Sequence, residues 1–207
     1  MAASGKFVPK EAPAVAGPAN AEQLQAEAMG LVRKLSEDEL EIGGVRLNQR
    51  LGRISFQANI AERERPLEYA LVHESGKIHE ALFATQAAAR DLHVAALLLH
   101  AVGQAPAIDV TWPKHGGEAK VPLNELIRMD GGSLSGTWKY NGSQSMQGGF
   151  AAQREGSFIA LLNDPAALIN HPAAGALQRD DVFSARKELL PPAGVTVTIH
   201  LTFPPEP

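Results

Sequence analysis

The chain has 207 residues, of which 44% are hydrophobic and 20% are charged, the balance of an ordinary globular protein. Its 19 basic and 23 acidic residues are well mixed, so the sequence has no basic stripe of the kind that nucleic-acid binding requires. The absence of cysteine excludes disulfides, thiolate catalysis, cysteine-ligated zinc and iron–sulfur clusters. No apolar run reaches the roughly 18–20 residues that span a bilayer.

Residues 1–19 are rich in Ala, Pro and Gly. Such a segment buries too little apolar surface to offset the entropy of ordering, so it predicts a flexible tether. It lacks an apolar core as long as that of a signal peptide. Two explanations stay open: a cytosolic protein with a loose tail, or an exported protein that has lost its signal peptide and keeps a spacer. The Ala/Pro composition favours export.

The segment 20–39 is predicted to be helical, and the main domain to cover 40–207. Asn20 can cap a helix over 21–35, where leucines recur on one face. From Leu40 the apolar period changes to two residues, so the runs 45–47 and 54–56 predict a hairpin around the turn 48–52.

The most apolar segment predicts a helix over about 86–102, with Thr85 as its N-cap and Gly103 just after its end. Beyond Leu92 this segment is apolar nearly all round, which is typical of a buried helix. We therefore expect it to be the central helix against which a sheet packs. The sheet-facing stripe is expected to contain Leu92, Ala96 and Leu99.

The remaining strands are expected to be joined mostly by short turns. They are predicted at 67–73, 78–83, 108–112, 136–140, 157–162 and 195–203, with short helices near 123–129 and after Asp164. The sequence thus predicts an α+β fold, in which an antiparallel-dominated β-sheet packs on one buried central helix, about 86–102, with further short helices.

One carboxylate breaks the pattern of the segment LEYALVHESGKIHEALFATQ, residues 67–86. Read as a hairpin that turns at Ser75-Gly76, the segment places Glu80 on the same face as Leu71 and Leu82, with His73 as its diagonal neighbour. A core carboxylate needs a partner. We expect backbone amides or His93 of the predicted helix to supply one and so hold the helix to the sheet.

Other interpretations of the polar cluster His73, His79, Glu80 and His93 stay open. Glu80, His73 and His93 could line a functional pocket, or the register could be misassigned and Glu80 solvated. No catalytic residue is assigned, and no metal or other cofactor is predicted, since HESGKIHE lies on a hairpin and not on the helix of an H-E-x-x-H zinc site.

The stretches PLEYALVHESGKIHEALFATQ and LHVAALLLHAVG resemble the signature of YdjY-type domains, which occur in bacterial exported proteins. The segments VTW, WKYNGS, GSFIALLNDPAALIN and GVTVTIHLTF agree more loosely, so the resemblance covers about residues 40–203. It implies that Gly76, Lys77, His79, Glu80, His93 and 97–99 matter. Some relatives are labelled ferredoxin-like because of an iron–sulfur segment, which a chain without cysteine does not share. The resemblance also implies a periplasmic or otherwise exported location.

These observations favour a non-enzymatic binding or envelope-associated module with an unknown protein or small-molecule ligand. One alternative is a hydrolase or metal-dependent enzyme that uses Glu80 with His73 or His93. Another is a subunit of a larger assembly, which an exposed apolar patch around Trp112, Trp138 and Tyr140 would favour. Neither nucleic acid nor a transmembrane segment is expected; any envelope association would run through the tether or a lost signal.

Overall fold

The structure, a computed structural model, describes residues 32–130, 132–146, 149–171 and 181–204. In this part of the chain the strands are β1 Val32–Lys34, β2 Glu39–Ile42, β3 Val45–Asn48, β4 Arg53–Ile60, β5 Tyr69–His73, β6 Ala81–Thr85, β7 Ala107–Lys114, β8 Gly117–Pro122, β9 Ile127–Met129, β10 Gly132–Ser133, β11 Lys139–Tyr140, β12 Ser145–Met146, β13 Gly149–Phe150, β14 Ser157–Ala160, β15 Ile169–Asn170, β16 Phe183–Ala185 and β17 Val197–Thr202. The helices are α2 Ala89–Leu98 and α3 Ala151–Glu155, with 3-10 turns η1 Ile78–Glu80, η2 Leu123–Leu126 and η4 Lys187–Leu189.

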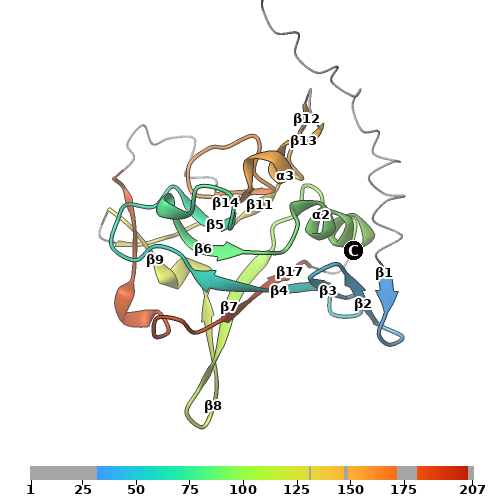
Figure 1. Ribbon diagram of the computed structural model, residues 1–207, viewed down its shortest axis with the longest axis horizontal. Helices are drawn as coiled ribbons and strands as arrows, with labels where there is room; N and C mark the ends of the chain where they lie inside the picture. Colours follow the sequence, from blue (N-terminus) through green and yellow to red (C-terminus); the bar gives the residue numbers. More distant parts are fainter. Residues whose placement is uncertain (1–31, 131, 147–148, 172–180, 205–207) are drawn as a thin grey trace, which may run out of the picture.

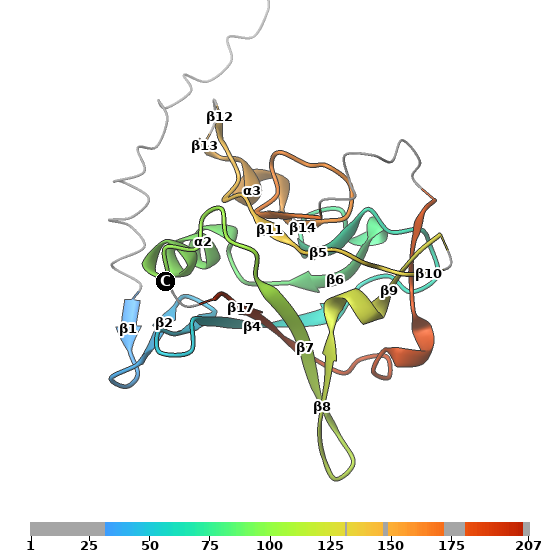
Figure 2. The ribbon, with the colours of Figure 1, turned by 180° about the vertical axis from the view of Figure 1, so that it is seen from behind.

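Twelve of these strands form one branched sheet, and β4 is its branch point. One path runs β1-β2-β3-β4-β6-β5-β14-β15-β11, while β17, β7 and β8 continue from the other edge of β4. Figures 1 and 2 show the two parts as layers, with β1–β4, β17 and β7 below and β5, β6, β14 and β11 above. Among the described pairs, β5–β6 and β14–β15 are parallel and the others antiparallel. The predicted antiparallel-dominated α+β fold is therefore the observed one in outline.

The N-terminal part of the described chain is a strand where a helix was predicted. Residues Val32–Lys34 pair with β2, and Arg33 forms an ion pair across the strands with Glu41. Pairing with β2 therefore outweighs the helical spacing of the leucines at this end of the predicted helix 21–35. The rest of that helix and the tether 1–19 lie outside the described residues.

The helix predicted over 86–102 is shorter and does not occupy the centre of the sheet. It runs from Ala89 to Leu98 and packs on β2, β3, β4 and α3 at one end of the molecule (Figure 1). It starts late because the Thr85 hydroxyl donates to the Gln57 carbonyl (2.6 Å) and accepts from the Ala87 N–H (3.1 Å). It ends early because His100 takes the left-handed conformation, with φ 51°.

The hairpin predicted for 67–83 is wrong, because β5 and β6 lie side by side in parallel. Their register pairs Tyr69 with Ala81, Leu71 with Phe83 and His73 with Thr85. Between the two parallel strands the chain returns to the start of β5 through η1, and not as an extended strand. In η1 the Glu80 N–H donates to the Lys77 carbonyl (3.1 Å). The Glu80 carbonyl then accepts from the Glu68 N–H (2.8 Å), which brings the start of β6 beside the start of β5.

Several other elements are where the sequence placed them. The hairpin β3–β4 turns at 49–52, and β17 alternates buried Val197, Ile199 and Leu201 with more exposed residues, as predicted. Asp164 does not start a helix, although its Oδ1 accepts the Ala166 N–H (2.8 Å) in the manner of a cap. The core lies between the two layers, around residues such as Leu71 and Phe83.

Candidate functional site

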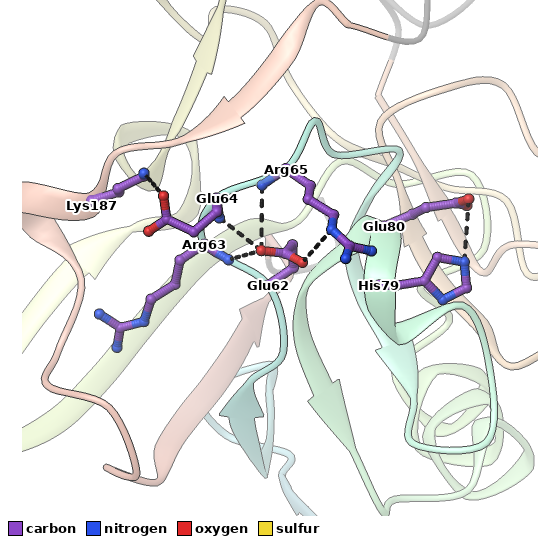
Figure 3. A network of polar contacts seen from close by, with 7 residues as sticks. All are labelled: Glu62, Arg63, Glu64, Arg65, His79, Glu80 and Lys187. Carbon is purple, nitrogen blue, oxygen red and sulfur yellow. Dashed lines mark hydrogen bonds and ion pairs between the residues drawn. The ribbon is translucent and has the colours of Figure 1, made fainter.

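Glu80 is not the buried carboxylate that the alternation predicted. Its side chain is 34% exposed, and the neighbouring His79 side chain is 62% exposed. His79 Nε2 lies 3.5 Å from Glu80 Oε1. Figure 3 shows both side chains beside the loop 62–65. The prediction fails because η1 turns this segment out of the sheet, so strand parity does not apply to it.

His73 and His93 lie in different surroundings from Glu80 and from each other. His73 Nδ1 contacts the Ser75 hydroxyl (2.7 Å) within the turn after β5. His93, on α2, has its Nδ1 2.9 Å from the Tyr140 hydroxyl, and its ring stacks on Phe150 with centroids 5.0 Å apart. The expected bond between Glu80 and His93 is therefore not formed, and His93 holds α2 to β11 instead.

Burial governs the protonation of the His93–Tyr140 pair. It lowers the pKa of His93 and raises the pKa of Tyr140, because each charged form would lose its hydration. The neutral imidazole can then accept a hydrogen bond from the Tyr140 hydroxyl, which keeps its proton. Within the described residues, no group of three or more His, Asp or Glu side chains is arranged to hold a metal ion.

The buried carboxylate in the described part of the chain is Asp91, which is 5% exposed in the first turn of α2. Its Oδ2 lies directly over Gly43, where an added Cβ would come within 2.1 Å of that oxygen. Its Oδ1 is 3.4 Å from Arg90 Nε. A carboxylate near a helix N-terminus is favoured by the helix dipole. This residue was missed because the helix start was predicted three residues too early.

The loop before β5 is closed by its own carboxylate (Figure 3). Glu62 Oε1 accepts the backbone N–H groups of Arg63 (2.8 Å), Glu64 (2.7 Å) and Arg65 (3.3 Å). These hydrogen bonds lower the pKa of Glu62, and Arg65 Nε lies 3.7 Å from its other oxygen. Lys187 of η4 pairs with Glu64, and Arg63 donates to the Pro191 carbonyl (2.5 Å). The network fastens the loop to the C-terminal segment.

A second polar chain connects two of the segments that carry the family resemblance. The Tyr69 hydroxyl donates to Asp164 Oδ2 (3.0 Å) and accepts from Lys77 Nζ (3.0 Å). This hydrogen bond raises the pKa of Lys77, while burial raises the pKa of Tyr69. Because the phenol stays protonated, the chain acts as a clasp between the β5–β6 crossover and the β14–β15 loop, and not as an activated base.

A hydroxyl–imidazole–hydroxyl chain crosses three strands on the outer face of the sheet. His200 of β17 contacts the Ser55 hydroxyl of β4 through Nδ1 (2.8 Å) and the Thr111 hydroxyl of β7 through Nε2 (3.0 Å). Ser55 has paired strands on both sides, so its neighbouring backbone N–H groups are not free to stabilise an oxyanion. The arrangement is that of a cross-strand polar ladder.

An open groove of about 1020 Å³ lies where β3 and β6 diverge from the same edge of β4. β3 pairs with β4 as far as Ser55, and β6 pairs with it from Asn59. Gln57 lies between them. The lining is mostly polar and includes Glu41, Arg46, Ser55, Gln57, Asn59, Glu74, Thr85, Gln86, Thr196 and Thr198, with Ile78 at the side. Of the four predicted cluster residues, none lines this groove.

Some charged side chains that line the groove have hydrogen-bond or ion-pair partners among the described residues, and one does not. Glu41 is paired with Arg33, and Glu74 accepts from Gln86 Nε2 (2.9 Å). The exposed Arg46 guanidinium makes no hydrogen bond or ion pair with the described residues. Neither strand alternation nor the quoted motifs pointed to this groove, because it depends on how two strands share one edge of β4.

The aromatic residues that were considered as markers of an assembly surface are buried inside the protein. Trp112, Trp138 and Tyr140 are 8%, 3% and 0% exposed. They therefore form no apolar surface patch. Within the described residues, no helix is long and apolar enough to cross a membrane.

Comparison with known proteins gives one match. No curated protein and no solved structure matches the chain. The family model for the YdjY domain matches residues 45–202, from the start of β3 to the end of β17, and therefore includes all the strands around the groove except β2. With most of its length matched, the chain belongs to the YdjY domain family.

Proposed function

We propose that this chain is a non-enzymatic binding module of an exported protein, and that the groove between β3 and β6 is its ligand site. The observation that carries the proposal is the groove itself, an open hollow of about 1020 Å³ with a polar lining on the outer face of the sheet. Its volume is at the upper end of the range of roughly 300–1,000 Å³ that is usual for small-molecule sites.

The lining suits an acidic saccharide. Gln57 and Thr198 offer neutral amide and hydroxyl groups, which can donate and accept hydrogen bonds as sugar hydroxyls do. Asn59 keeps its amide N–H groups for a ligand, since its Oδ1 accepts from Thr196 (3.1 Å), while the Ser55 hydroxyl is held by His200. Arg46 supplies an exposed guanidinium without a partner among the described residues, and a guanidinium can bind a carboxylate through two parallel hydrogen bonds.

The ligand class is tested with two sugar probes of equal length, acidic trigalacturonate and neutral chitotriose. In an NMR titration, trigalacturonate should shift the amide signals of β3, β4 and β17, and chitotriose should bind more weakly. Arg46→Gln should remove the preference for the acid by weakening only trigalacturonate. Arg50→Gln is the matched control, because Arg50 pairs with Asp38 outside the groove.

Each result bears on a separate part of the proposal. Equal binding of both probes by the wild type would reject the acidic ligand but keep the groove as a saccharide site. Shifts confined to other strands, or no shift with either probe, would reject the groove as a saccharide site. Equal effects of Arg46→Gln and Arg50→Gln would show only a general loss of positive charge.

The proposed exported location rests on the Ala/Pro-rich composition of residues 1–19 and on the location that the resemblance to YdjY-type domains implies. In the organism that makes the protein, immunoblotting of cell fractions should find it outside the cytoplasm. Co-fractionation with a cytoplasmic marker enzyme would reject export without affecting the groove.

A further inference from the structure

The hairpin formed by β7 and β8 extends beyond the body of the molecule in both views (Figures 1 and 2). β8 pairs with β7 on one side and with no other described strand, so within the described part of the chain its outer edge is open. With six residues, β8 is longer than β1, the three-residue strand at another end of the branched sheet. An open edge of this length can pair with another strand.

The turn of the hairpin decides which residues present their backbone groups at this edge. Lys114 pairs with Gly117 around the two-residue turn His115-Gly116, so they form a hydrogen-bonded pair. Hydrogen-bonded and non-hydrogen-bonded pairs alternate along an antiparallel ladder. Glu118 and Lys120, one and three residues after Gly117, therefore occupy non-hydrogen-bonded pairs with β7. Their N–H and C=O groups therefore point outward. The positions of Pro113 and Pro122 are consistent with this assignment. Both fall at non-hydrogen-bonded positions of the β7–β8 ladder, where no N–H is needed.

The outward residues have opposite charges and are two positions apart. We propose that β8 pairs antiparallel with β8 of a second copy of this chain, about a twofold axis at Ala119. Glu118 of each copy then lies opposite Lys120 of the other. The two Glu118–Lys120 positions are hydrogen-bonded pairs between the copies. The backbone groups and the charged side chains are therefore complementary in the same register.

Several features of β8 favour its own copy as the partner. Lys120 and Glu118 are exposed on the outer face of the sheet, and the Lys120 side chain is 58% exposed although its Nζ lies 2.9 Å from Asp109. Ala119, at the proposed axis, is small. A lysine on an edge discourages pairing with arbitrary strands. In this register, however, each lysine meets a glutamate, so the same charges select a second copy.

The test is sedimentation velocity of the full chain over a range of concentrations. Wild type should show a reversible monomer–dimer equilibrium. Glu118→Lys or Lys120→Glu should each weaken it about tenfold or more, because two attractive cross-strand pairs become repulsive. An equimolar mixture of the two variants should dimerise again, since every Lys then faces a Glu. Glu37→Lys, an exposed substitution on the turn before β2, is the charge-matched control and should dimerise like wild type.

Thermal melts confirm that each variant is folded before it is compared. A wild type that stays monomeric at every concentration would overturn the proposal. So would dimers that survive both single substitutions, or a mixture that fails to restore the dimer while each variant is folded. Restoration in the mixture identifies this edge and this register, because no general effect of charge would reverse when the two variants meet.

Discussion

Gly76 and Gly156 lie back to back, and their contact joins the β5–β6 crossover to the turn that leads into β14. A Cβ added to Gly156 would lie 3.1 Å from the Gly76 Cα, and one added to Gly76 would lie 3.3 Å from the Gly156 carbonyl oxygen. The same carbonyl accepts the His73 N–H (2.8 Å). The glycine in the sequence SGK is therefore required for close backbone packing, independently of any ligand.

Gly156→Ala is expected to destabilise the protein by about 1–3 kcal/mol. Gly156 has a φ of 70°, which strains an alanine, and the new Cβ would press on Gly76. Gly194→Ala is the control, because Gly194 has a similar φ of 82° but open space around its Cβ position. Urea unfolding of both variants separates strain from contact. Equal losses of unfolding free energy would mean that the contact with Gly76 contributes nothing.

Tyr69→Phe should cost about 1–3 kcal/mol, because it removes the hydroxyl that connects Lys77 and Asp164. Lys77→Met should cost less, since the Lys77 side chain is exposed. The clasp predicts that the effect of Lys77→Met nearly disappears in the Tyr69→Phe background. A double-mutant cycle from urea unfolding measures this coupling. If Lys77→Met costs the same in both backgrounds, the two residues are not coupled and the clasp is rejected.

The sequence correctly predicted those structural features that depend only on residues close together in the chain. The alternation of β17 and the turn between β3 and β4 were correct because one buried face fixes strand register. The reversal at Gly76 was misread because a hairpin and a short parallel crossover both begin with a turn. Only the tertiary contact with Gly156 and the pairing of Glu68 with Glu80 distinguish them.

The candidate site was predicted less well, because its geometry also depends on tertiary contacts between residues far apart in the sequence. Strand parity placed Glu80 in the core, but a 3-10 turn has no strand parity, and the residue is partly exposed. His93 was expected to partner Glu80, but its Nδ1 contacts the hydroxyl of Tyr140, which is 47 positions away in the sequence. The groove could not be read from the chain, because it arises where β3 and β6 share one edge of β4.

Glu80→Ala is expected to change the free energy of unfolding by no more than about 0.5 kcal/mol, as is usual for surface substitutions. Asp91→Ala, which removes the buried carboxylate over Gly43, should cost about 0.5–3 kcal/mol. Urea unfolding of the two variants at neutral pH makes the comparison. A larger loss for Glu80→Ala than for Asp91→Ala would restore Glu80 as a buried, partnered carboxylate and contradict its position on η1.

The pH dependence of stability should report the burial of His93. Because burial lowers its pKa in the folded protein, the unfolded chain binds more protons once the pH falls to about 6.5, the ordinary histidine value. Its contribution to stability is thus fully present above about pH 6.5 and is lost as the pH falls toward the folded pKa. Burial also lowers the pKa of His171 and His200, which add to the same trend.

His93→Phe should therefore reduce this loss of stability without abolishing it. The phenyl ring can still stack on Phe150, although the Tyr140 hydroxyl loses its acceptor and the variant is less stable at neutral pH. The measurement is the free energy of unfolding in urea at several values between about pH 5 and pH 8. His115→Gln, which removes an exposed imidazole at the turn between β7 and β8, is the control and should follow the wild-type curve. If His93→Phe also follows that curve, offset only by a constant, His93 does not become protonated on unfolding, and its burial as a neutral acceptor for Tyr140 is refuted.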